Sequence, residues 1–254
     1  MSIVRAHPDK PALVLLHGWG MHGGVWTDLV ARLGNGRDVL APDLPGHGAS
    51  PMVEPYAVDA VVDRLAAAAP GRCVLAGWSL GGQLALAWAR RHPQQVQRLI
   101  LIATTPRFVR AADWPHGMSI DVLTGFAESL ARDAAATLQR FLLLETQGDA
   151  QARAVARRLE AALASRPLAG RAALEQTLRW LQATDLRAML RAIAQPALVL
   201  HGEADRITPP AAGEFLAATL SQGRIRLIAG AAHAPFISAP DAVCRLMTDF
   251  CDEQ

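Results

Sequence analysis

One serine in this chain has the residue type and the setting of a nucleophile. Ser79 lies in Gly77-Trp78-Ser79-Leu80-Gly81, between a short apolar run and a pattern with helical spacing. A serine on such a tight turn has a strained backbone, and it needs small neighbours so that strand and helix can approach. The start of the helix also favours a developing negative charge. We therefore interpret Ser79 as a nucleophile rather than as part of a plain glycine-rich turn.

A serine hydroxyl needs a base to take its proton and a third group to orient that base. The histidines that follow Ser79 are His92, His116, His201 and His233. Only His233 follows a late apolar run, in a loop of small residues, so we predict that it is the base. Glu203 and Asp205 both follow the preceding apolar run, and we choose Asp205 because it lies farther into its loop. The alternatives are an ordinary loop histidine and an aspartate that caps a helix.

A second glycine-rich turn, His17-Gly18-Trp19-Gly20, follows the first apolar run of the chain. A turn of this kind can aim a backbone N–H into a site at the carboxyl edge of a sheet. Together with the N–H after the nucleophile, it names Trp19 and Leu80 as oxyanion donors. Such donors contribute about 3 kcal/mol each in the transition state. Asp43 and His47 precede the nucleophile in a turn-rich loop, and we predict that they are structural.

These residues require a sheet whose strands end on one edge. Apolar runs of strand length alternate with helical patterns, which predicts a mostly parallel sheet covered on both faces. The runs occur at 12–16, 39–42, 73–77, 99–103, 196–202 and 224–228. From residue 107 to about 190 the pattern is only helical. We predict an α/β core formed by residues 1–106 and 191–254, with a helical cap inserted at 107–190.

Composition limits the class of protein. The 254 residues fit one α/β domain with an insertion. No apolar run is long enough to span a membrane, and the N-terminal residues lack a secretory pattern, so we expect a cytoplasmic protein with no membrane partner. We also expect it to be a monomer. A formal charge of +2 without a basic, aromatic-rich stripe argues against nucleic-acid binding. The three cysteines have no metal-ligand spacing, and we expect neither a metal nor a cofactor.

The whole chain resembles the α/β-hydrolase superfamily in its Ser79, Asp205 and His233 and in its His-Gly-Trp-Gly loop. The tryptophans of both motifs and the segment 140–145 are similar to the carboxylesterases of biotin synthesis that act on pimeloyl-acyl-carrier-protein methyl ester. This resemblance implies a serine esterase that works through an acyl-enzyme. It also implies a substrate path lined by Trp19, Ser79, Leu80, Phe141, Leu142, Leu143, Leu144, Glu145 and His233. Glu145 departs from the family pattern, which has an uncharged amide there.

The positive charge of the chain is concentrated in the predicted cap. Residues 107–190 hold 11 arginines and 9 acidic residues, whereas the charges of the remainder balance. Arg153 and Arg157 share one face of a predicted helix, with Arg158 alongside. The resemblance implies that these three residues and Arg140 dock an acidic acyl-carrier protein that bears the pimeloyl methyl ester. The alternative is an ordinary solvated helix face.

Other functions share this fold and this set of residues. A broad-specificity carboxylesterase, a perhydrolase and a carbon–carbon bond hydrolase differ from the first interpretation only in the pocket. A ligand receptor without catalysis is the alternative from another class, and the complete triad with both oxyanion loops argues against it. Epoxide and haloalkane hydrolases need a carboxylate where Ser79 stands. The sequence therefore favours a carboxylesterase.

Overall fold

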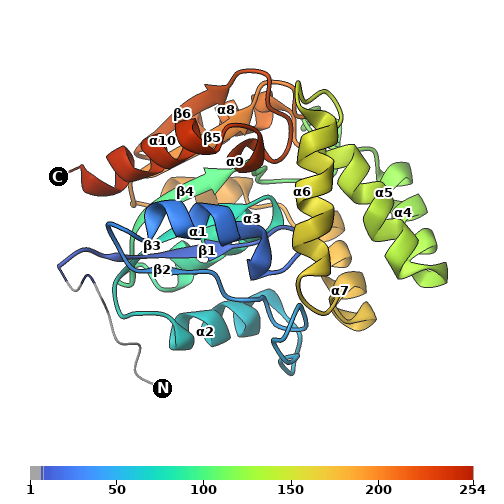
Figure 1. Ribbon diagram of the computed structural model, residues 1–254, viewed down its shortest axis with the longest axis horizontal. Helices are drawn as coiled ribbons and strands as arrows, with labels where there is room; N and C mark the ends of the chain where they lie inside the picture. The colour runs from blue at the N-terminus through green and yellow to red at the C-terminus, as the bar shows by residue number, and fades with distance from the viewer. Residues whose placement is uncertain (1–6, 8, 254) are drawn as a thin grey trace.

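The computed structural model describes residue 7 and residues 9–253, and a six-stranded sheet runs through it (Figure 1). The strands are β1 (Ala12–Leu16), β2 (Val39–Leu40), β3 (Cys73–Trp78), β4 (Val96–Ile102), β5 (Ala197–Gly202) and β6 (Gly223–Ile228). Their order is β2-β1-β3-β4-β5-β6, and every neighbouring pair is parallel. The order reverses between β1 and β3, and ligands of open α/β sheets bind outside the carboxyl ends of the strands at such a point.

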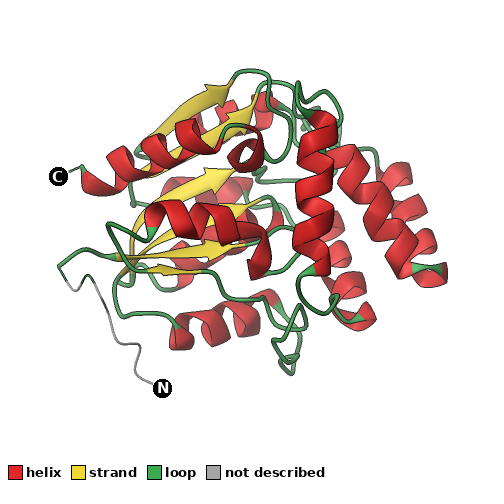
Figure 2. Cartoon of the chain, viewed as in Figure 1, coloured by secondary structure: helices red, strands yellow, loops and turns green. Residues whose placement is uncertain are grey.

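Helices cover both faces of the sheet, as the sequence predicted (Figure 2). On one face α1 (Thr27–Leu33) contacts α10 (Pro240–Asp252), and both lie in front in Figure 1. The other face is covered by α2 (Val58–Ala68), α3 (Leu80–Arg91) and α8 (Pro210–Thr219). The sequence analysis missed two short elements, η1 (Gly23–Trp26) and α9 (Pro235–Ser238). Each is a single turn, too short to show a periodic pattern.

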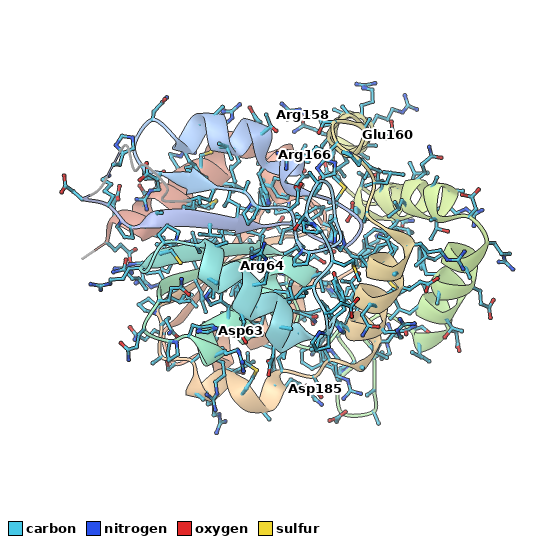
Figure 3. The ribbon with its side chains drawn as sticks, turned by 90° about the horizontal axis from the view of Figure 1, so that it is seen from below. Asp63, Arg64, Arg158, Glu160, Arg166 and Asp185 are labelled. Carbon is cyan, nitrogen blue, oxygen red and sulfur yellow. The ribbon has the colours of Figure 1, made fainter. Side chains whose placement is uncertain are left out.

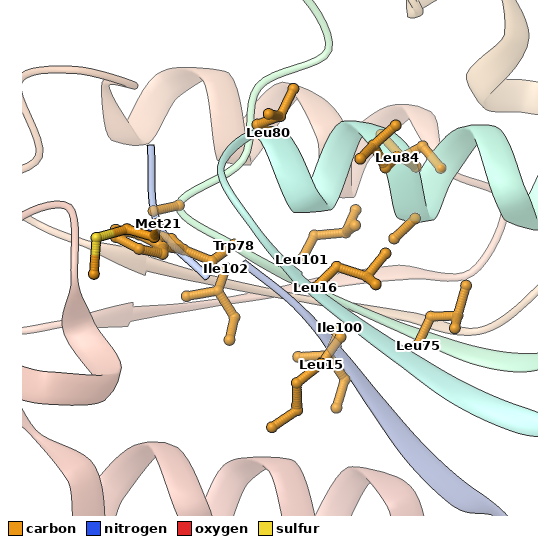
Figure 4. Packing of buried hydrophobic residues seen from close by; sticks show 14 of the residues in the cluster. Leu15, Leu16, Met21, Leu75, Trp78, Leu80, Leu84, Ile100, Leu101 and Ile102 are labelled. Carbon is orange, nitrogen blue, oxygen red and sulfur yellow. The ribbon is translucent and has the colours of Figure 1, made fainter. Parts of the chain in front are cut away.

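The core lies along the central strands. Every residue of β1 and β3 is buried, because helices pack on both faces and leave no side for polar residues. Figure 4 shows Leu16, Leu75 and Leu101 of these strands and of β4 beside Leu80 and Leu84 of α3. Burying one such side chain contributes about 1.5–3 kcal/mol. This packing fixes the ends of β1 and β3, from which both glycine-rich turns emerge.

Four helices fill the predicted insertion between β4 and β5, at the end of the sheet to which the strands point (Figures 1 and 2). They are α4 (Ile120–Arg132), α5 (Ala134–Glu145), α6 (Ala152–Ala164) and α7 (Arg171–Ala183), followed by η2 (Arg187–Ala192). The expectation of helix from residue 107 onward is wrong for 107–119. That stretch forms isolated bridges, Val109 with Met118 and Ala111 with Trp114, because Pro115 and Gly117 disfavour a helix there.

The insertion is fastened to the loops of the sheet by side chains from both sides. Arg166, between α6 and α7, pairs with Asp43 at 2.5 Å, and Figure 3 labels Arg166. Asp43 also accepts hydrogen bonds from the N–H groups of Gly23 and Ala49. The Asp43 carboxylate is therefore occupied by the loop and by Arg166, which agrees with the prediction of a structural role.

Candidate active site

Ser79 sits on a strained turn between β3 and α3. Its backbone has φ 55° and ψ −116°, a conformation that residues other than glycine rarely adopt. The turn is tight enough that a Cβ on Gly77 would lie 2.3 Å from the carbonyl oxygen of Gly81. A Cβ on Gly81 would lie 2.2 Å from the carbonyl oxygen of Leu16 in β1. The glycines of the motif are therefore required by the close approach of strand and helix, and this packing holds the serine in its strained conformation.

Asp205 lies against His233, in the loops that follow β5 and β6. The two side chains meet at 2.8 Å between Asp205 Oδ2 and His233 Nδ1. The N–H groups of Ile207 and Thr208 donate to Asp205 Oδ1, and the Thr208 hydroxyl donates to Oδ2. Burial alone would raise the pKa of Asp205, but His233 and His201 beside it bring that pKa below its usual value. Asp205 is thus an ionised carboxylate with a fixed orientation.

One ring nitrogen of His233 is held and the other is free. Because Nδ1 donates to Asp205, the hydrogen-bond pattern assigns the lone pair to Nε2. Nε2 is buried and has no hydrogen-bond partner in the described part of the chain. The loop itself is fixed at its backbone, since Trp78 Nε1 donates to the His233 carbonyl at 2.7 Å. Its N–H donates to the carbonyl of Glu145 at 3.1 Å. This arrangement orients the ring and leaves Nε2 without a partner, as suits a general base.

The two predicted oxyanion donors emerge from neighbouring strands. Leu80 is the first residue of α3, and Trp19 lies in the turn after β1, which pairs with β3. Neither N–H donates a hydrogen bond to any residue that the structure describes. Gly18 brings the turn close to the motif, because a Cβ there would lie 3.0 Å from the Trp78 ring. Two free backbone donors at this edge, one at a helix start, suit an oxyanion.

The structure separates the chosen acid and base from the other candidates. Glu203 is exposed, and its side chain makes no hydrogen bond to any residue that the structure describes, although its N–H donates to the carbonyl of Ile228. His92 bonds to Asp63 on α2, and the His116 ring packs against Trp114. His201 lies within β5, its Nε2 2.5 Å from the Thr208 carbonyl and 3.4 Å from Asp205 Oδ2. His201 therefore contacts Asp205 from within the sheet.

Helix α5 turns one of its faces towards this region. The Phe141 ring packs edge-on against Trp19 with ring centroids 5.0 Å apart, and Glu145 is buried one turn later. Leu142 is buried and Leu144 half-buried. Leu143 is 58% exposed, so the structure does not bring this predicted substrate-lining residue to the site. The reason is helical geometry, because residues four apart share a face and the residue midway between them points away.

Sequence reasoning missed Asp149, which ties the turn after α5 to the His233 loop. Its Oδ2 accepts hydrogen bonds from the N–H of Ala232, at 2.9 Å, and from the hydroxyl of Ser238. The neighbouring Ala150 N–H donates to the Gly230 carbonyl. In the sequence Asp149 follows a glycine and has only the signal of a turn residue. Its partners are about 80 positions away, and local spacing does not show them.

Comparison with known proteins decides the family. Residues 11–240 match the family described as alpha/beta hydrolase fold. The chain belongs to that family. A pimeloyl-acyl-carrier protein methyl ester esterase from Aromatoleum aromaticum is 44% identical over 95% of this chain and 98% of its own length. The protein of that name from Nitrosomonas europaea is 44% identical over 92% of each chain. A bromoperoxidase from Bacillus anthracis has a TM-score of 0.87 at 20% identity, covering 97% of this chain and 94% of its own, which shows a shared fold only.

The predicted docking arginines of this α/β hydrolase differ in what they contact. Arg140, Arg153 and Arg157 are exposed and form no ion pair with any described residue. Arg140 also lines a surface cavity of about 590 Å³ together with Ala152 at the start of α6. Arg158, labelled in Figure 3, donates to the carbonyl of Ile237, so it holds α6 against α9. Three of the four side chains are therefore free to meet a partner.

Two further properties concern other kinds of site. Within residues 9–253, no group of three or more histidine, cysteine and acidic side chains is placed to hold a metal ion. None of the described helices has the length and apolarity needed to cross a membrane.

The cysteine thiols form no disulfide, and burial raises the pKa of Cys73 to about 12. Cys73 is thus a packing residue of β3 and a poor nucleophile.

Proposed function

We propose that this α/β hydrolase is a serine carboxylesterase that hydrolyses the methyl ester of pimeloyl-acyl-carrier protein, a reaction of biotin synthesis. The observation that carries the reaction type is the state of His233, held at Nδ1 by Asp205 while Nε2 is free. Ser79 on its strained turn supplies the nucleophile. The substrate is proposed from the names of the two relatives that match nearly the whole chain.

In the first half of the reaction Ser79 Oγ attacks the ester carbonyl while His233 Nε2 takes its proton. Asp205 stabilises the imidazolium that forms and keeps the ring in place. The carbonyl oxygen becomes an oxyanion and accepts hydrogen bonds from the N–H groups of Leu80 and Trp19. His233 then gives its proton to the leaving methoxide, which departs as methanol. The pimeloyl group remains on Ser79 as an ester.

In the second half a water molecule replaces methanol. His233 Nε2 takes a proton from the water, and the hydroxide attacks the carbonyl of the acyl-enzyme. The same two N–H groups receive the second oxyanion. When it collapses, His233 returns the proton to Ser79 Oγ and the free carboxylate of the pimeloyl chain is released. His233 therefore accepts and returns every proton that moves in the two halves of the reaction.

We further propose that residues 107–190 act as a cap that selects the substrate. Phe141 covers the turn of Trp19, so α5 forms a wall beside the oxyanion donors. Arg140, Arg153 and Arg157 are proposed to dock the acidic carrier, while Arg158 fixes α6. All three triad residues come from one chain, and we propose that the protein acts as a monomer in the cytoplasm with the carrier as its partner.

The test is methanol release from methyl pimeloyl-acyl-carrier protein by the purified protein, with Ser79→Ala as the control. We expect turnover by the wild type and none by the variant. The wild-type gene, but not the variant, should also restore growth of a biotin-requiring strain that lacks its own esterase. Hydrolysis of p-nitrophenyl acetate without hydrolysis of the carrier ester would favour the broad-specificity alternative. Hydrolysis of neither ester would contradict the esterase proposal itself.

A further inference from the structure

A buried acid that the mechanism above does not use lies next to the proposed triad. Glu145 is the last residue of α5 and is 1% exposed. Its Oε2 is fully buried without a hydrogen-bond partner, and its side chain forms no ion pair with the residues that the structure describes. A buried carboxylate in this condition is strongly disfavoured, whereas an un-ionised acid is disfavoured far less.

Glu145 also contacts the loop that carries the base. Its carbonyl accepts the N–H of His233 at 3.1 Å. On the same face of α5, one turn earlier, Phe141 packs against Trp19. The buried face of this helix therefore reaches from the oxyanion turn to the His233 loop. The end of α5 can sit there only if the Glu145 side chain is tolerated in a place closed to solvent, where its Oε2 has no partner among the described residues.

The ionisable groups around Glu145 come from three segments. His201 and Asp205 belong to β5 and the loop after it, His233 to the loop after β6, and Asp149 to the turn after α5. The two histidines already face Asp205, and Asp149 is occupied by Ala232 and Ser238. Arg206 is exposed, and its Nε lies near Gly148 rather than on Glu145.

No cation in this surrounding balances an ionised Glu145. Burial first, and the negative charge of Asp205 second, raise the pKa of Glu145 well above its usual value. Geometry and electrostatics therefore agree on which form is present. An un-ionised glutamic acid also has nearly the shape of glutamine.

We propose that Glu145 works un-ionised, as a positioning residue that seats the end of α5 on the His233 loop and leaves Asp205 as the single negative charge facing the base. This inference rests on the proposed triad. A second carboxylate beside His233 would stabilise its protonated form, so the base would hold its proton to a higher pH. A neutral Glu145 adds no such stabilisation of the protonated base.

Infrared difference spectroscopy tests the protonation state directly, because the carbonyl of an un-ionised carboxylic acid absorbs apart from a carboxylate. At pH 7 we expect the wild-type spectrum to contain one un-ionised acid band that Glu145→Gln removes. The matched control is Glu160→Gln, an exposed position on α6 (Figure 3), which should remove only carboxylate bands. Loss of carboxylate bands alone in Glu145→Gln would overturn the proposal.

The pH dependence of kcat/KM for p-nitrophenyl acetate gives a second, independent readout. If Glu145 is neutral, the midpoint of the acidic limb is the same in the wild type and in Glu145→Gln. This holds even if the substitution changes the maximal value of kcat/KM. If Glu145 is ionised, the substitution removes a negative charge near the base and lowers that midpoint by about one pH unit. A midpoint lowered in this way overturns the proposal.

Folding provides a third readout through proton linkage. With Glu145 un-ionised in the folded state and ionised in the unfolded state, the folded state holds one more proton, so its stability falls as the pH rises above about 4.5. We expect the folding equilibrium of the wild type to weaken about tenfold per pH unit relative to Glu145→Gln between pH 5.5 and 7.5. Parallel curves for the two proteins would contradict the inference.

Two additions keep the outcome clear. If Glu145→Gln does not fold, Glu145→Met serves for the infrared comparison, since it also removes the acid and retains a side chain of similar length. Esterase activity retained by Ser79→Ala would overturn the triad, whereas the un-ionised band of Glu145 would still be seen. Failure of the triad and failure of this inference are therefore distinguishable.

Discussion

Two histidines of this molecule are alike in place and burial and differ in their partners. His17 follows β1, His233 follows β6, and both are fully buried in loops at the edge of the sheet. Both nitrogens of His17 are occupied, because Nδ1 donates to the Gly18 carbonyl and Nε2 accepts the N–H of Leu44, each at 2.9 Å. His233 is held only at Nδ1, by Asp205. Burial is common to both residues, and the free nitrogen is what distinguishes them.

A free ring nitrogen is not sufficient by itself, since His47 Nε2 and His201 Nδ1 are also buried without a partner in the described part of the chain. What His233 adds is the Asp205 carboxylate on its other nitrogen. Burial, and then the nearby His47, lower the pKa of His17 well below its usual value, so it remains neutral and links two loops. The centroids of the His17 and His47 rings lie 5.2 Å apart. A histidine with two backbone partners can hold loops together but cannot exchange a proton without breaking a bond. We expect the two groups to respond differently to substitution.

The largest effect should come from the catalytic side of the comparison. Ser79→Ala and His233→Ala should each lower kcat for p-nitrophenyl acetate by about three to six orders of magnitude, because nucleophile and base act as one unit. Chemical unfolding should show that Ser79→Ala leaves stability nearly unchanged, since only a hydroxyl at the edge of the sheet is lost. More than a tenth of wild-type activity in either variant would contradict the triad.

Asp205 should follow, because it orients the base without touching the substrate. Asp205→Asn should lower kcat about 10³- to 10⁴-fold by disturbing the tautomer and the position of His233. Glu203→Gln is the matched control from the same loop, and we expect it to keep the wild-type rate because the Glu203 side chain is exposed and makes no hydrogen bond to a described residue. A larger loss in Glu203→Gln than in Asp205→Asn would reverse the assignment of the acid.

The structural side of the comparison should appear in acid stability. Burial lowers the pKa of His47 to about 4, whereas the unfolded chain binds that proton near 6.5. The unfolded state therefore holds more protons between these values, and stability falls as the pH falls from 6.5 to 4. The loss from His47 is about 3 kcal/mol at pH 4.

Urea unfolding of the wild type and of His47→Gln at pH 7 and pH 4 measures this contribution. We expect the difference in unfolding free energy between the two proteins to shrink by about 3 kcal/mol on going to pH 4, because glutamine does not titrate. An unchanged difference would show that His47 is protonated in the folded protein. It would remove the contrast between structural and catalytic histidines.

The smallest effect concerns the exposed arginines. Changing Arg140, Arg153 and Arg157 together to Glu should lower kcat/KM for the carrier-bound ester by about tenfold at low salt, or 1.4 kcal/mol. Exposed charges act mainly on encounter, so the loss should diminish as salt is added. Activity on p-nitrophenyl acetate should be retained.

A control with the same change of charge replaces Arg64, Arg90 and Arg245, which are exposed on the helices that cover the sheet. We expect this variant to lose much less activity on the carrier ester. Equal losses in both triple variants would indicate an effect of net charge. Equal losses on both substrates would indicate damage to the insertion.

The sequence predicted those features that depend on short-range pattern. Apolar runs and helical spacing marked all six strands, and the spacing of the motifs singled out Ser79, Asp205 and His233 before their geometry was known. Asp149 and the backbone bond from His233 to Glu145 escaped, because they join segments that are far apart in the chain. The outward turn of Leu143 was also missed, since a run of apolar residues does not show which one faces the core. The sequence pattern shows which residues have side chains that can react, and the packing of the folded chain shows which of them are held in position.

The central claim is that Ser79 is a nucleophile activated by His233, and covalent labelling tests it most directly. Diethyl p-nitrophenyl phosphate phosphorylates activated serines, and peptide mass mapping locates the label. We expect one label per chain, on Ser79, formed at least 10³-fold more slowly in His233→Ala. Glu203→Gln should react at the wild-type rate. A label on another residue, or labelling of His233→Ala at the wild-type rate, would contradict the account.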